Sequence, residues 1–124
     1  MAELTMNARL WTMLVLPESL WAAHLLIAYS LKESACASQS RLLLLVVSAA
    51  ALAPMIVNAF FAWTTWHSWP RPEAGGAAGL PEDEEPRWRS RARFMAATAF
   101  CASLLFGLVI AGQTLPMVML RPCD

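Results

Sequence analysis

The stretch LLLLVVSAAALAPMIVNAFFAWTTW, Leu42–Trp66, contains no charged side chain in 25 residues. A helix needs about 20 apolar residues to cross the hydrocarbon core of a bilayer, which is about 30 Å thick. Two further stretches, Leu10–Leu31 and Phe94–Leu120, are of similar length and hold a single charged residue between them, Glu18. A buried helix of a small soluble protein needs a polar face, and the second and third stretches have none. The sequence therefore predicts an all-α membrane protein with three transmembrane helices.

The composition is typical of one membrane domain covering residues 1–124. Apolar residues make up 58% of the chain and charged residues 15%, whereas soluble domains average roughly 45–50% and about 25%. The net charge of zero argues against nucleic-acid binding, and the apolar content argues against disorder. We expect the first span to be retained, because its apolar part exceeds the roughly 7–15 residues of a cleaved signal peptide. The expected helices cover about 10–31, 42–66 and 94–120.

The Lys and Arg residues predict the orientation, because cytoplasmic loops of membrane proteins carry the excess of these residues. One side holds Arg9, Arg71, Arg87, Arg89, Arg91 and Arg93, and the other holds Lys32, Arg41 and Arg121. We therefore expect a cytoplasmic N-terminus, a cytoplasmic loop 67–93, a periplasmic C-terminus and a location in the bacterial inner membrane. Tryptophans, which anchor at membrane interfaces, gather at the same cytoplasmic boundary: Trp11, Trp63, Trp66, Trp69 and Trp88.

The loop 67–93 is rich in proline and glycine, and it carries four acids at 82–85 followed by alternating arginines. Acids at its start would favour a helix that begins near Pro86. The loop is interpreted either as a plain solvated segment or as a docking surface for a partner or for anionic lipid headgroups.

Cysteines follow two of the spans on the same side of the membrane. Cys36 comes after the first span and Cys123 after the third, so the topology places both thiols in one oxidising compartment. We expect a Cys36–Cys123 disulfide. Two free thiols, or a copper site that includes Met117 and Met119, are the alternatives. Cys101 lies in mid-helix and is interpreted as a packing residue.

Four carboxyl, imidazole or amide side chains lie inside the spans: Glu18, His24, Asn58 and Gln113. Glu18 and Asn58 are both eight residues from the cytoplasmic end of their stretches, and we expect a hydrogen bond between them, with Glu18 protonated. A contact of Glu18 with another chain, or a proton-relay role, is the alternative. His24 and Gln113 match in depth from the outer side, and we expect them to meet. His24 is interpreted as a buried, hydrogen-bonded histidine, because no second axial ligand for a haem lies at its depth.

Small residues recur every four positions on two spans, which predicts closely packed helices. They are Ala50, Pro54, Asn58 and Ala62 on the second span, and Ala99, Ser103, Gly107 and Ala111 on the third. The sequence shows no phosphate-binding loop, nucleophile–base pair or metal cluster. We therefore expect no catalytic residue, no cofactor and no small-molecule substrate of its own.

Two short patterns resemble a known family. Trp21-Ala-Ala-His24, followed by Tyr29 and Cys36, resembles the opening helix of small, mostly uncharacterised proteobacterial membrane proteins. Gln113-Thr-Leu-Pro116 and Pro122-Cys123 are similar to the end of the same proteins. The resemblance covers the first span and the end of the third, and it implies an association with haem-copper terminal oxidases. The family's usual Gly-Pro before the tryptophan is absent here, so Glu18 departs from the pattern.

We therefore expect a non-catalytic accessory subunit of a respiratory membrane complex. Its partners would be larger membrane subunits and lipids, and the resemblance implies a terminal oxidase. The alternatives are an oxidase assembly or copper-handling factor that uses Cys36 and Cys123, and a small proton channel or transporter that uses Glu18.

Overall fold

The computed structural model describes residues 2–38, 41–68 and 84–119 of the chain, with side chains from residue 6 onward and, in the third segment, at 88–116 and 118–119. Each segment is one α-helix: α1 (Ala2–Ser38), α2 (Arg41–Ser68) and α3 (Glu84–Met119). The all-helical expectation is confirmed for these residues. The helices α1 and α2 extend past both ends of their charge-free stretches, and α3 begins ten residues before Phe94. Residues 84–93, which we expected in the loop 67–93, are therefore helical, because the Glu, Arg and Ala residues there are compatible with a helix.

Three helices are long and apolar enough to cross a membrane, over Met6–Ser38, Arg41–Ser68 and Trp88–Pro116. At 37 residues, α1 is about 55 Å long, well beyond the roughly 30 Å of the hydrocarbon core. Large apolar side chains such as Leu26, Leu42 and Leu108 are exposed on the outside of the bundle. That outward apolar surface is what lipid-facing helices present.

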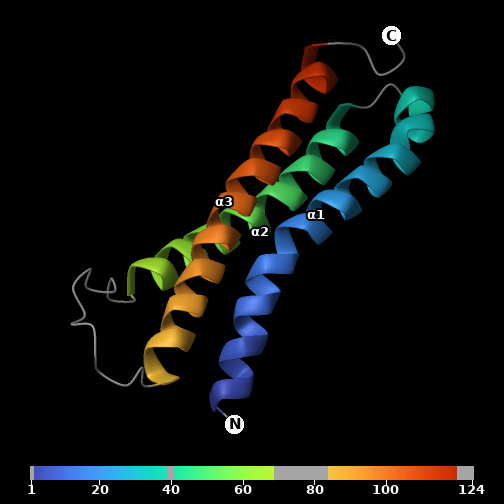
Figure 1. The fold of residues 1–124 in the computed structure, drawn as a ribbon. Helices are drawn as coiled ribbons and strands as arrows, with labels where there is room; N and C mark the ends of the chain where they lie inside the picture. The colour runs from blue at the N-terminus through green and yellow to red at the C-terminus, as the bar shows by residue number, and fades with distance from the viewer. Residues whose placement is uncertain (1, 39–40, 69–83, 120–124) are drawn as a thin grey trace.

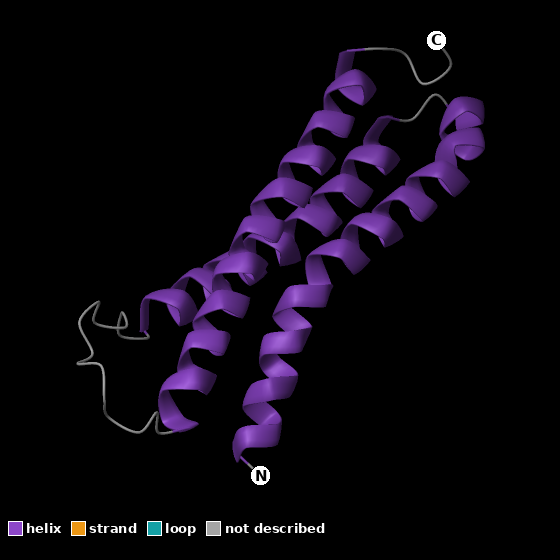
Figure 2. Ribbon diagram, in the orientation of Figure 1, coloured by secondary structure: helices purple, strands orange, loops and turns teal. Residues whose placement is uncertain are grey.

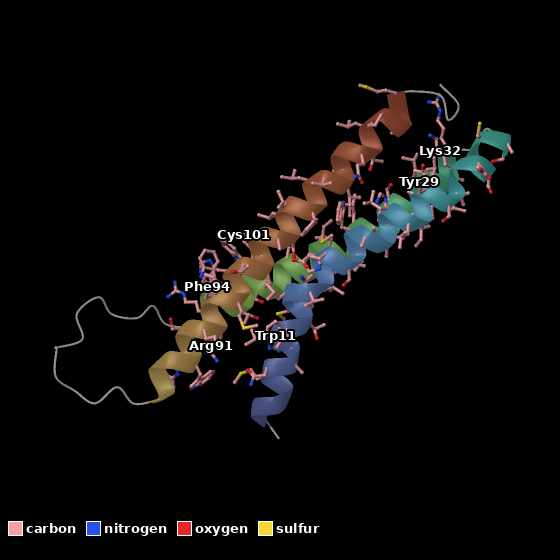
Figure 3. The ribbon with its side chains drawn as sticks, turned by 45° about the vertical axis from the view of Figure 1, so that its right-hand side comes forward. Trp11, Tyr29, Lys32, Arg91, Phe94 and Cys101 are labelled. Atoms are coloured by element: carbon pink, nitrogen blue, oxygen red, sulfur yellow. The ribbon has the colours of Figure 1, made fainter. Side chains whose placement is uncertain are left out.

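The helices run up, down and up, so that each is antiparallel to the next (Figure 1). All three pack against one another. The start of α1 and the end of α3 consequently lie at opposite ends of the bundle (Figure 1). Figure 3 shows Trp11 and Arg91 toward one end and Tyr29 and Lys32 toward the other.

A proline lies inside α1, and the helix changes direction part-way along its length (Figure 2). Pro17 has no backbone N–H and its ring crowds the preceding turn, which bends helices. The proline is fully buried against the neighbouring helices. The carbonyl of Met13, four residues earlier, therefore loses its helical hydrogen-bond donor.

The buried residues recur at alternating steps of four and three positions on α2, and at steps of three, four or seven on α3 and, from Leu10 to His24, on α1. The main members are Leu10, Met13, Pro17 and His24 on α1, Leu44, Ser48, Ala51, Met55, Asn58 and Ala62 on α2, and Ala92, Ala96, Ala99, Ser103 and Ile110 on α3. This spacing of 3.5 is the seam of left-handed helix packing. Many of the buried side chains are alanine or serine, so the helix backbones approach closely.

Candidate functional site

Asn58 links all three helices from the middle of α2. Its side chain is only 5% exposed. The Asn58 Nδ2 group donates one hydrogen bond to the Met13 carbonyl oxygen of α1 and another to Ser103 Oγ of α3, both at 3.0 Å. Ser103 Oγ in turn donates to the Ala99 carbonyl at 2.8 Å. We call Met13, Asn58 and Ser103 the amide clamp.

The amide clamp supplies a hydrogen-bond donor to a backbone carbonyl that Pro17 leaves without its helical partner. An α-helix would satisfy the Met13 carbonyl with the N–H of residue 17, and proline has none. Lipid offers no water to satisfy that carbonyl, so a helix kinked inside a membrane needs a donor from a neighbour. Asn58 supplies the donor across the interface between α1 and α2.

The predicted hydrogen bond between Glu18 and Asn58 is wrong. The Asn58 Nδ2 group donates within the amide clamp. A protonated Glu18 would have to donate to the Asn58 amide oxygen instead, but Glu18 is exposed on the outer face of α1 and does not reach it. Glu18 follows the buried Pro17 directly and is therefore turned by about 100° around the helix. Among the described residues, Glu18 forms no ion pair or hydrogen bond.

His24 is buried and bonds to α2. Its side chain is 2% exposed, and its Nε2 lies 3.1 Å from Ser48 Oγ. Gln113 of α3, which we expected to meet His24, forms no hydrogen bond with it, since His24 Nδ1 and Gln113 Oε1 are both without partners in the described bundle. The interpretation of His24 as a buried, hydrogen-bonded histidine agrees with this geometry, although its partner is a different residue.

Sequence reasoning missed Ser48, the partner of His24. The sequence spacing could have identified Ser48, because it lies ten residues before Asn58 and therefore on the same buried face of α2. A polar residue at a seam position that faces a histidine on the antiparallel neighbour is a candidate hydrogen-bond partner. The four-residue spacing used for the second span placed Ala50 rather than Ser48 on the packed face.

Three buried polar atoms keep unused hydrogen-bonding capacity within the described bundle: Trp21 Nε1, His24 Nδ1 and Gln113 Oε1. The Trp21 ring packs against Phe106, with 5.4 Å between ring centroids. An indole N–H can only donate, an amide oxygen can only accept, and an imidazole nitrogen does either according to its tautomer. The Asn58 amide nitrogen and the Ser103 hydroxyl thus have hydrogen-bond partners, whereas these three atoms have none among the described residues.

The small residues predicted to pack on α3 differ in burial. Ala99 and Ser103 are buried, Gly107 is half-buried and Ala111 is exposed. On α2 the burial of the stripe increases along the chain, from the exposed Ala50 to the buried Ala62. A four-residue step advances by about 40° around a helix, so three steps rotate a stripe by about 120°.

The cysteines differ in their state. Cys36 is half-buried near the end of α1 and is disulfide-bonded. Cys101 is a free, exposed thiol on α3. Cys123 lies outside the described residues, as do Met117's side chain and the loop 69–83, so the Cys36–Cys123 pairing stays a prediction.

Aromatic side chains cluster where α2 ends against α3. The rings of Trp63 and Trp66 lie 5.5 Å apart, and Trp63 is 5.0 Å from Phe100. The His67 ring lies 4.2 Å from Trp63. On the neighbouring α1, the guanidinium carbon of Arg9 lies 5.9 Å from the Phe61 ring centroid. This end of the bundle combines aromatic rings with arginines, as membrane interfaces do.

No group of three or more metal-binding side chains occurs in the part of the chain that the structure describes. Comparisons of the chain with family models, with curated proteins and with solved structures find no match. The resemblance to oxidase-associated proteins therefore stays an expectation drawn from the sequence alone.

Proposed function

We propose that this protein is a non-catalytic accessory subunit of a larger respiratory membrane complex, with which it packs through the outer face of α1. The observation that supports the proposal is the placement of Glu18. It is exposed in mid-span, and its neighbour Ser19 bonds back to the Val15 carbonyl at 3.0 Å. Acids inside membranes normally face protein or water rather than lipid. A partner helix with a hydrogen-bonding or cationic group at that depth meets this requirement.

The sequence resemblance suggests which complex is involved. The Trp21–His24 pattern and the Gln113–Pro116 pattern imply a haem-copper terminal oxidase. We propose that the chain binds no cofactor and stabilises the larger subunits by lateral helix packing. It lies in the bacterial inner membrane, with its N-terminus in the cytoplasm.

Glu18 variants test the proposal when the native complex is purified in mild detergent and its subunits are counted. Glu18→Leu should lower the amount of this chain that co-purifies, because the polar contact is lost. Glu18→Gln keeps a hydrogen-bonding group and should retain more. Glu33→Gln is the matched control, since Glu33 is an exposed acid of the same helix outside the charge-free stretch.

Two results would count against the accessory-subunit proposal. One is a Glu18→Leu protein that co-purifies as well as the Glu33→Gln control. The other is a complex that assembles with unchanged stability and turnover in cells that lack this chain.

A homo-oligomeric proton channel is the second candidate, because an outward-facing Glu18 also suits contact between copies of this chain. In that case cross-linking in native membranes yields homo-oligomers, and Glu18→Gln abolishes proton flux in vesicles. The copper-handling alternative requires thiolates, which a disulfide-bonded Cys36 does not offer.

We also propose that Cys36 pairs with Cys123 and ties α1 to the C-terminal tail. The disulfide state of Cys36 and the free thiol of Cys101 support this pairing. Mass spectrometry of a non-reducing digest should find the two peptides linked. Free thiols at both positions in protein from native membranes would contradict it.

A further inference from the structure

The start of α1 and the end of α2 lie at the same end of the bundle (Figure 1). A cavity of about 180 Å³ opens between them. Its lining comes from two helices only: Met6, Arg9, Leu10 and Met13 on α1, and Thr65 and Ser68 on α2. The α1 residues follow helical spacing and therefore share one face.

The lining is apolar on the inside and cationic at the mouth. Leu10 and Met13 are buried, whereas Arg9 is exposed. The Arg9 guanidinium lies over the Phe61 ring, a contact that restrains its position. No acid is present among the lining residues to neutralise it.

Hydroxyl groups of α2 complete the polar side of the cavity. Ser68 Oγ donates to the Thr65 carbonyl at 2.8 Å, so its proton is already used. The Thr65 hydroxyl is half-buried and makes no hydrogen bond to a described residue. The hydrogen-bond donors available to a ligand are therefore the guanidinium N–H groups of Arg9 and the hydroxyl of Thr65.

We propose that this cavity binds an anionic glycerophospholipid, with the phosphodiester against Arg9 and Thr65 and the start of an acyl chain against Leu10 and Met13. A guanidinium matches phosphate oxygens with two parallel hydrogen bonds. A soluble phosphate would leave the apolar side chains of Leu10 and Met13 without a contact. A zwitterionic lipid would bring its own cation toward Arg9.

The position along the bundle fits a headgroup. The exposed Trp11, near the start of α1, and Trp63, near the end of α2, lie at the same end of the bundle as Arg9. Tryptophans mark the headgroup level of a bilayer. All residues of the site belong to this chain, so a test of lipid binding does not depend on whether the accessory-subunit proposal is correct.

The test reconstitutes the full chain in bilayer discs of phosphatidylcholine with a minor fraction of phosphatidylglycerol of the same acyl chains. Native mass spectrometry then measures the lipid retained by the released protein. Wild type should retain phosphatidylglycerol in preference to phosphatidylcholine. Arg9→Gln should lower that retention about tenfold, because a charge-assisted pair of hydrogen bonds is lost.

Arg91→Gln is the matched control, since Arg91 is an exposed arginine at the same end of the bundle (Figure 3) and does not line the cavity. It removes the same charge and should leave the retention within about twofold of wild type. Thr65→Val removes the second donor without altering charge and should lower the retention about threefold. This variant carries the test if Arg9→Gln fails to fold, as judged by circular dichroism.

Three results would overturn the lipid site. The first is an equal loss in Arg91→Gln and Arg9→Gln, which would mean a diffuse attraction. The second is wild-type retention by Thr65→Val. The third is displacement of the lipid by glycerol 3-phosphate or inorganic phosphate, which would mean a site for a soluble phosphate.

Discussion

At the scale of single residues, the interior of this bundle is organised by one asparagine and one proline. Pro17 bends α1 and leaves the Met13 carbonyl without an N–H donor. Asn58 donates to that carbonyl and to Ser103 at once. Because both contacts are buried away from water, the asparagine holds three helices in one register.

We predict that Asn58→Ala destabilises the bundle by about 1–2 kcal/mol, because the Met13 carbonyl loses its donor and Ser103 loses a partner. Pro17→Ala restores a backbone N–H at position 17, so it should recover part of this loss in the Asn58→Ala background. Unfolding in mixed micelles, followed by tryptophan fluorescence, measures each variant. Strictly additive changes in the free energy of unfolding in this double-mutant cycle would contradict the role of Asn58 as the donor that replaces the missing N–H of Pro17.

A second prediction concerns Gln113, whose buried Oε1 atom has no partner in the described bundle. We predict that Gln113→Leu changes the free energy of unfolding by less than about 0.5 kcal/mol or stabilises the protein, because an unpaired acceptor is removed. The same unfolding assay measures it beside Asn58→Leu, which should destabilise. A large loss in Gln113→Leu would show that the amide has a partner outside the described chain.

At the scale of elements, the three helices pack with a period of 3.5 residues. The buried positions of α2 alternate steps of four and three from Leu44 to Ala62. A strict four-residue stripe instead rotates away from its neighbour, which is why Ala111 ends on the exposed face. The small residues that matter for packing are those on the alternating seam.

We predict opposite responses to enlargement at two small positions of α3. Ala99 is completely buried, so Ala99→Leu should cost about 1–3 kcal/mol by forcing the helices apart. A Cβ added at Gly107 would lie 3.7 Å from Met55 Cγ, an ordinary contact. Gly107→Ala should therefore be neutral or stabilise by up to about 1 kcal/mol. Unfolding in micelles distinguishes the two, and equal losses would contradict the packing described here.

At the scale of the whole molecule, an odd number of spans separates the two ends of the described chain. The start of α1 and the end of α3 lie at opposite ends of the bundle (Figure 1). One end carries the exposed Arg9, Arg89 and Arg91. The positive residues predict that this end faces the cytoplasm.

We predict that a green fluorescent protein fused before Met1 is fluorescent, because it stays in the cytoplasm. Alkaline phosphatase fused after Asp124 should be active, because it folds with its disulfides in the periplasm. Measurement in living bacteria checks both ends independently. One active and one inactive reporter would put both ends on the same side of the membrane and contradict three spans. Loss of both signals in cells that make both fusions would contradict the orientation alone.

The sequence by itself determined that this chain forms three membrane-length helices, because the length of a charge-free stretch is matched to the thickness of a bilayer. It also indicated that Asn58, Ser103 and His24 belong to packed faces. The tertiary structure alone decided their partners: Asn58 bonds to Met13 and Ser103, His24 to Ser48, and Glu18 faces outward. The physical reason is that residue counting measures depth along a helix axis, whereas contact also depends on rotation about that axis. The Pro17 bend and the seam of 3.5 residues set that rotation, and which residues they bring into contact is decided only once the helices pack together.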